Sequence, residues 1–79
     1  MEIGWWNRDE EGKKYQVHLE VFGGKLIFRC QRRRFEPWED YLNPTDQDWE
    51  TALTQAENCL QRRLTTAKIV DKIRRRDLN

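Results

Sequence analysis

Few side chains of this sequence are suited to catalysis, and the first to consider is His18, the only histidine. An unperturbed imidazole titrates near neutral pH, and a carboxylate such as Glu20, two residues along the chain, would complete a general base. The same pair is more often found on a solvated strand surface. No serine occurs in the chain, which excludes serine-hydrolase chemistry. We therefore expect no catalytic residue and no enzymatic activity.

Metal and phosphate sites are also not indicated. Cys30 and Cys59 allow at most one disulfide and are too few, with one histidine, for the usual four-ligand zinc site. We expect both to be free thiols packed as small apolar groups. Gly23-Gly24 precedes a predicted strand rather than a helix, so it predicts a turn and not a phosphate-binding loop. No cofactor and no small-molecule ligand are implied.

Charged residues stand in blocks along the chain, although 15 basic and 14 acidic residues nearly cancel. Residues 25–34 contain five basic side chains and no acidic one, whereas residues 35–58 contain seven acidic side chains and no basic one. Residues 59–79 are basic again. The first basic block makes nucleic acid a candidate partner, while the net charge of +1 argues against a dedicated DNA-binding protein.

The predicted strands gather this basic block on one face. Apolar and polar residues alternate from Lys14 to Phe22, which predicts a half-buried strand, and the two glycines predict a hairpin turn before a second strand over residues 25–33. Counting outward from the turn pairs Lys14 with Arg33 and segregates the polar side chains from the apolar ones. The predicted nucleic-acid contacts are Lys14, Gln16, His18, Arg29, Gln31, Arg32, Arg33 and Arg34. Lysine and arginine would contact phosphates, and the other three would lie nearer base edges.

The second half of the sequence predicts two helices. Thr45 with Asp48 three residues later predicts an N-cap and a variant of the capping box. An apolar stripe follows at spacings of three and four: Trp49, Ala52, Leu53, Ala56, Leu60 and Leu64. Arg62 and Arg63 are expected in its last turn. Thr65-Thr66 interrupts good helix formers, so we predict a separate helix over about residues 67–76, capped by Thr65 or Thr66.

The predicted fold class is α+β, in one domain over residues 1–79. A three-stranded antiparallel β-meander, whose first strand covers residues 3–7, packs on one long α-helix and is followed by a short C-terminal helix (βββαα). Residues 35–42 are expected to form a crossover loop. This order of elements, together with the basic sheet face, resembles the DNA-binding domains of plant ethylene-response factors and of phage-integrase arm-binding domains. The resemblance covers about residues 5–64, rests on no shared sequence motif, and implies that the free sheet face docks on DNA.

Other readings account for the same residues. Basic side chains on an exposed sheet face also prevent an edge strand from pairing with other chains. The basic run Lys72, Arg74, Arg75 and Arg76 suits a helix C-terminus as well as a phosphate contact. Protein association is the third reading, because aromatic residues are enriched among interface anchors and the second helix carries more apolar surface than so small a core covers. Its predicted contacts are Trp38, Tyr41, Ile69 and Ile73.

We therefore expect a small non-catalytic binding or regulatory module. Its most direct role is protein–protein interaction, through a protein partner or a homodimer joined by the C-terminal helices, and DNA binding through the sheet face is the alternative. No run approaches the ~18 apolar residues of a membrane span. The first residues lack the basic and apolar regions of a signal peptide. The expected compartment is the cytoplasm, without membrane contact.

Overall fold

In the computed structural model, which describes residues 1–78, the central feature is the hairpin of β2 (Lys14–Phe22) and β3 (Lys25–Gln31). Gly23 and Gly24 join the strands with φ of 58° and 77°, the left-handed conformation that a tight two-residue turn requires. The predicted register is confirmed from the pair beside the turn, Phe22 with Lys25, to the pair of Gln16 with Gln31. Alternation of apolar and polar residues therefore sufficed to specify this pairing.

The predicted pair of Lys14 with Arg33 is wrong, because β3 ends at Gln31. The Gln31 side chain donates a hydrogen bond to the backbone carbonyl of Glu36 at 2.8 Å. The Glu36 backbone N–H in turn donates to the Arg33 carbonyl at 3.2 Å. These bonds turn the chain away from β2 directly after the strand, so Lys14 pairs only with Arg8 of β1.

Two further strands complete the sheet. β1 (Glu2–Arg8) pairs with β2 along its whole length, which confirms the predicted first strand. β4 (Glu39–Asp40) pairs with β3, so the expectation of a loop alone over residues 35–42 is wrong. The Tyr41 backbone N–H donates to the Phe28 carbonyl at 3.0 Å and continues this pairing. The result is an antiparallel four-stranded sheet in the order β1-β2-β3-β4.

Both helices begin at the predicted caps. α1 (Asp46–Gln61) starts after Thr45, whose Oγ1 accepts a hydrogen bond from the Asp48 N–H at 3.1 Å while the Asp48 carboxylate accepts one from the Thr45 N–H at 2.9 Å. α2 (Ala67–Arg74) starts after Thr66. The capping box and the break between the helices are confirmed. No helix within residues 1–78 combines the length and the apolar character needed to cross a membrane.

α1 ends earlier than its apolar stripe predicts. Arg62 is the C-cap and Arg63 has a left-handed φ of 59°. The Leu64 N–H donates to the Cys59 carbonyl at 2.9 Å, and the Arg63 N–H donates to Leu60 at 3.0 Å. This is the Schellman arrangement that terminates a helix. Arg62 and Arg63 therefore lie beyond the last turn, and Leu64 is exposed rather than part of the buried stripe.

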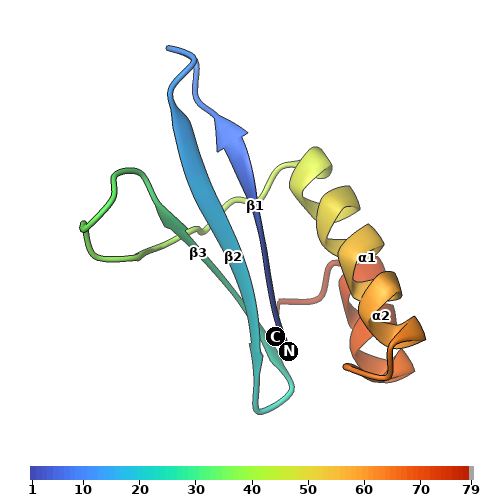
Figure 1. Ribbon diagram of the computed structural model, residues 1–79. Coiled ribbons are helices and arrows are strands. Elements are labelled where there is room, and N and C mark those ends of the chain that lie inside the picture. Colours follow the sequence, from blue (N-terminus) through green and yellow to red (C-terminus); the bar gives the residue numbers. More distant parts are fainter. Residues whose placement is uncertain (79) are drawn as a thin grey trace.

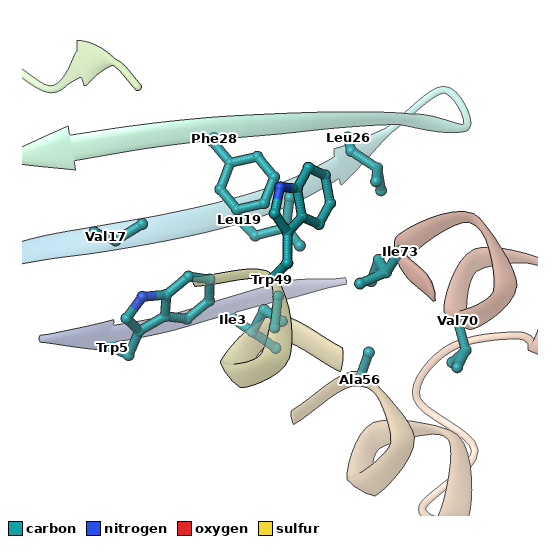
Figure 2. Close-up of a cluster of buried hydrophobic side chains, with 11 residues drawn as sticks. Ile3, Trp5, Val17, Leu19, Leu26, Phe28, Trp49, Ala56, Val70 and Ile73 are labelled. Carbon is teal, nitrogen blue, oxygen red and sulfur yellow. The ribbon is translucent and has the colours of Figure 1, made fainter. Parts of the chain in front are cut away.

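The helices cover one face of the sheet (Figure 1), and the apolar core lies between the two layers (Figure 2). Phe28 packs edge to face against Trp49 and Trp5, with ring centroids 4.9 and 6.3 Å apart. The buried apolar residues are Ile3, Trp5, Val17, Leu19, Leu26, Phe28, Cys30, Trp49, Ala52, Ala56, Val70 and Ile73. Both cysteines are free, and Cys30 is packed in this core as predicted. The α+β architecture is confirmed, with a 16-residue helix as its long helix.

Candidate functional site

The outer face of the sheet, opposite the helices, consists of the residues that alternate with the core residues along each strand. The strand register places Trp6, Gln16 and Gln31 in one row across β1, β2 and β3. Arg8 and Lys14 form the next row. Trp6 is 63% exposed. A large apolar ring therefore stands on the solvent side of the sheet among polar and cationic side chains.

Basic residues of the loop after β3 extend this end of the face. The loop projects away from the helices (green in Figure 1). An open hollow of about 460 Å³ lies among Trp6, the two glutamines and the three arginines of the loop. We call this region the cationic half of the outer face: Trp6, Arg8, Lys14, Gln16, Gln31, Arg32, Arg33 and Arg34.

Most charges of the cationic half are not neutralised by residues that the structure describes. Arg32 lies 4.0 Å from the Asp9 carboxylate and over the Tyr15 ring, 5.1 Å from its centroid. Lys14 and Arg33 have no ion-pair partner within residues 1–78. All three side chains are exposed. The positive charge is thus available to an anionic ligand.

Acidic residues lie beside the cationic half, in the turn between β1 and β2. A wider hollow of about 690 Å³ there is lined by Asp9, Glu10 and Glu11 as well as by basic residues. The Asp9 carboxylate is committed to the turn, since it accepts hydrogen bonds from the N–H groups of Glu11 and Lys13, both at 2.9 Å. The mixed charge of this hollow makes it a poorer anion site than the cationic half.

The other end of the outer face is organised around His18. We call it the histidine half: Glu2, Gly4, His18, Glu20, Ile27, Arg29 and Trp38. The His18 Nδ1 lies 2.8 Å from the Glu2 carboxylate, and its ring stacks on Trp38 with centroids 4.7 Å apart. Gly4 faces the imidazole on the neighbouring strand, and a Cβ there would lie 2.6 Å from the His18 Cδ2. The imidazole of His18 therefore lies against Gly4, which has no side chain, and stacks on the indole of Trp38.

The predicted nucleic-acid contacts divide between these two halves. The structure brings together Lys14, Gln16, Gln31, Arg32, Arg33 and Arg34, and it places His18 and Arg29 in the histidine half. There Arg29 lies 3.8 Å from Glu20, and the carboxylate beside His18 is Glu2 rather than Glu20. Gln31 is also partly committed, through its hydrogen bond to the loop.

Trp6 belongs to the cationic half but was absent from the predicted contacts. A signal for it was present in the sequence. Trp5 and Trp6 are neighbours in a predicted strand, and neighbouring strand residues point to opposite faces. One of the two indoles must therefore face solvent, and the apolar residue Ile3, two positions before Trp5, assigns the exposed position to Trp6.

The predicted association contacts are all engaged within the fold. Trp38 stacks on His18, and Tyr41 donates a hydrogen bond to the Asp48 carboxylate at 2.6 Å. Ile69 is half-buried against the core. Ile73 is 1% exposed, so it lies inside the core and not on the surface. The packing of α2 against the core covers Ile73 and part of Ile69, whereas Phe35 and Leu42 remain exposed.

The basic run at the end of α2 is neutralised by acidic neighbours. Arg74 lies 3.6 Å from both Glu57 and Asp71, and Arg75 lies 3.1 Å from Asp71. The Arg76 guanidinium donates to the Asp46 carboxylate at 2.6 Å. These ion pairs agree with a structural role for the basic run at the end of the helix. The cationic half differs because most of its cations have no acidic partner among the described residues.

Asp48 is the one buried charged residue within residues 1–78, and it joins three parts of the chain. Its carboxylate accepts hydrogen bonds from the Trp5 Nε1 at 3.0 Å, the Asn7 Nδ2 at 2.6 Å and the Tyr41 hydroxyl at 2.6 Å. The Thr45 N–H supplies a fourth bond. A carboxylate offers about four lone-pair positions, so none remains for a substrate. Asp48 is a structural link and not a reactive group.

Hydrogen bonding governs the titration of this cluster. Burial raises the pKa of Asp48, but the bonds from Tyr41, Asn7, Thr45 and Trp5 outweigh it and hold the pKa below the ordinary value of 3.8. Burial, then the hydrogen bond to Asp48, raises the pKa of the Tyr41 hydroxyl. Asp48 is therefore charged and Tyr41 neutral at physiological pH, which keeps the phenol a donor.

Comparison with protein-family models, curated proteins and solved structures finds no match to this chain. Among residues 1–78, the cationic half combines uncompensated charge, an exposed aromatic ring and an open hollow. It is the candidate functional site.

Proposed function

We propose that the protein binds nucleic acid through the cationic half of the outer face. The observation that carries the proposal is the gathering of the three arginines of the loop around an exposed indole, with Arg8 and Lys14 in the next row of the sheet. Lysine and arginine neutralise phosphates, and phosphate contacts supply most of the non-specific affinity of nucleic-acid-binding proteins. An exposed aromatic ring among cations adds a surface for bases.

The near-zero net charge does not oppose this proposal, because charges act locally in salt solution. The Debye length is about 8 Å at physiological ionic strength, whereas the molecule measures 36 × 22 × 21 Å. Acidic residues of α1 and the carboxylates of Glu2 and Glu20 are therefore largely screened from a ligand on the cationic half. Asp9, Glu10 and Glu11 of the neighbouring turn are close enough to reduce its positive potential. The basic run of α2 is excluded from the site because its guanidinium groups are paired.

The test compares two double variants that remove equal charge. Arg33→Ala with Arg34→Ala removes two cations of the cationic half, and Arg74→Ala with Arg75→Ala removes two from α2. Binding to a labelled mixed-sequence DNA, as duplex and as single strand, is followed by anisotropy between ~50 and ~200 mM salt. We expect the first variant to weaken binding and to lower the salt slope by about two. Equal losses in both variants, or no binding of the unmodified protein at ~50 mM salt, would refute the proposal.

Protein association, the role that the sequence predicted first, is a second candidate. It is favoured by Phe35 and Leu42, which are 90% and 76% exposed on the segment between β3 and α1. Sedimentation at increasing concentration tests the homodimer, with Phe35→Ser and Leu42→Ser as the variants that should restore a monomer. A monomeric mass of the unmodified protein at every accessible concentration would contradict homodimer formation.

A further inference from the structure

The four tryptophans differ in what their indoles contact. Trp5 and Trp49 are buried in the core, and Trp38 stacks on His18. The ring of Trp6 makes no ring pair within residues 1–78, and its N–H donates no hydrogen bond there. Trp6 is thus the one described tryptophan whose ring has no aromatic partner, and its 63% exposed indole is open to a ligand.

The residues around Trp6 favour a negatively charged ligand that carries accessible planar rings. Gln16 lies directly opposite Trp6 on β2, and the arginines of the loop line the same hollow. Arg34 lies over the ring of Phe35, 5.2 Å from its centroid, and that ring is 90% exposed. The cations are therefore flanked by one exposed ring on the sheet and another on the loop. Alternation of cations and aromatic rings is typical of surfaces that bind single-stranded nucleic acid.

A single strand fits this surface better than a duplex. Bases in a duplex are already stacked on each other, so an indole gains a stacking partner only by unstacking them. The bases of a single strand are free to stack on the ring. A duplex laid along the whole face would also meet the Glu2 and Glu20 carboxylates of the histidine half. A few nucleotides placed on the cationic half avoid both costs.

The dimensions of the cationic half match a few nucleotides. Strands lie about 4.8 Å apart, so the Trp6 and Gln31 positions are separated by about 10 Å across the sheet. The row of Trp6 and the row of Arg8 are about 7 Å apart along the strands. A short oligonucleotide laid across the sheet from β1 to β3 would contact the Trp6 indole at one end and the arginines of the loop at the other.

From these observations we infer that the cationic half binds single-stranded nucleic acid, with a base stacked on the Trp6 indole and the phosphates on the loop arginines. Gln16 is the side chain placed to hydrogen-bond the edge of the stacked base. This inference rests on the proposed nucleic-acid binding and specifies its ligand. It differs from the docking of the whole sheet face on DNA, which the family resemblance implied.

The experiment measures binding of the full chain to an oligothymidine of about 12 nucleotides, within the site sizes known for single strands, and to a duplex of equal length. Trp6→Leu keeps the position apolar but removes the ring, and Trp6→Phe restores a smaller ring. Phe22→Leu is the control, because that ring is 72% exposed at the hairpin end of the sheet, outside the cationic half. Unchanged unfolding midpoints show that all three variants retain the fold.

We expect tighter binding to the single strand than to the duplex. Trp6→Leu should weaken single-strand binding about 5- to 150-fold, the range that loss of one base–aromatic stack produces, and should strongly reduce quenching of indole fluorescence by the oligonucleotide. Trp6→Phe should recover most of the affinity, and Phe22→Leu should leave it unchanged.

The outcomes separate the two proposals. If Trp6→Leu leaves single-strand affinity unchanged while Arg33→Ala with Arg34→Ala reduces it, base stacking is wrong and nucleic-acid binding stands. Tighter binding to the duplex, insensitive to Trp6→Leu, overturns the inference in the same way. If the unmodified protein binds neither nucleic acid at ~50 mM salt, both proposals fail together.

Discussion

Trp5 and Trp6 are neighbours in β1, yet they lie in opposite environments. The Trp5 ring packs against Phe28, and its N–H donates to the buried Asp48 carboxylate. The Trp6 ring projects from the outer face, 63% exposed and without such contacts within residues 1–78. One residue of sequence separates an indole that completes the core from one that is open to a ligand. The difference follows from strand geometry, since successive side chains point to opposite faces.

The same contrast holds for the charges on the two faces. On the inner face, the Asp48 carboxylate has four donors, and no buried side-chain polar atom among the described residues is without a hydrogen bond. On the outer face, Lys14 and Arg33 have no acidic partner within residues 1–78. The buried polar groups are therefore all hydrogen-bonded within the fold, whereas part of the charge on the outer face is exposed without an acidic partner among the described residues.

The largest expected effect is on the inner face. Asp48→Ala should lower the free energy of unfolding by about 3–5 kcal/mol, because it leaves the buried donors of Trp5, Asn7 and Tyr41 without an acceptor. Urea denaturation measures the loss. Asp46→Ala, an exposed acid in the first turn of the same helix, should cost no more than about 1 kcal/mol. Similar costs for the two variants would show that Asp48 acts only as a helix-terminus charge.

The next effect compares the neighbouring tryptophans directly. Trp5→Leu should destabilise the fold by about 2–4 kcal/mol, through loss of packing and of the bond to Asp48. Trp6→Leu should change stability by less than about 0.5 kcal/mol. Thermal unfolding of the two variants decides the matter. A large loss from Trp6→Leu would mean that this indole is part of the fold, and its assignment to a ligand would have to be abandoned.

A smaller effect tests how firmly the histidine half is held. Gly4→Ala should cost about 1–2 kcal/mol, because its Cβ would displace the His18 ring from Glu2 and Trp38. In a His18→Ala background the same substitution should cost much less, and a double-mutant cycle measures this coupling. An equal cost in both backgrounds would indicate a clash with the strand backbone instead.

Protonation of Asp48 should reduce stability less than its replacement by alanine. It removes the charge of the carboxylate but leaves both oxygen atoms in place. The pKa of Asp48 is lower in the folded protein than its ordinary value of 3.8, so its contribution to stability is complete above that value. This contribution is lost as pH falls through the lowered folded pKa. Stability measured from pH 6 to pH 2 should therefore decline less steeply in Asp48→Asn than in the unmodified chain. Parallel profiles would contradict the assigned direction of the shift.

The elements that were predicted correctly depend on local patterns. The hairpin register follows from alternation within β2 and from two glycines at the turn. The helix starts follow from Thr45 and Thr66, whose hydroxyl groups cap N–H groups three residues later. Errors occurred where a terminus is set by bonds that no composition rule reveals, as at Arg63, which ends α1 in a left-handed conformation usually taken by glycine.

The candidate site was predicted in part. Polar residues of β2 and β3 were placed on the correct face, because the register was correct. His18 and Arg29 were grouped with the arginines of the loop, although ion pairs with Glu2 and Glu20 and the stack on Trp38 engage their side chains within the fold. Trp6 was not predicted as a contact residue, because an exposed ring indicates a binding site only when the residues beside it on the neighbouring strands and loop are known.

Local sequence patterns specify which side chains share a face and where the helices begin, because period-two alternation and capping residues act over a few positions. Which polar and aromatic groups remain without a partner depends on contacts between residues far apart in the chain. Asp48 reaches Trp5 and Asn7 across 43 and 41 residues, and Ile73 fills the core beneath the sheet. Such contacts depend on how whole elements pack, and that packing left Trp6 and the cations beside it facing solvent.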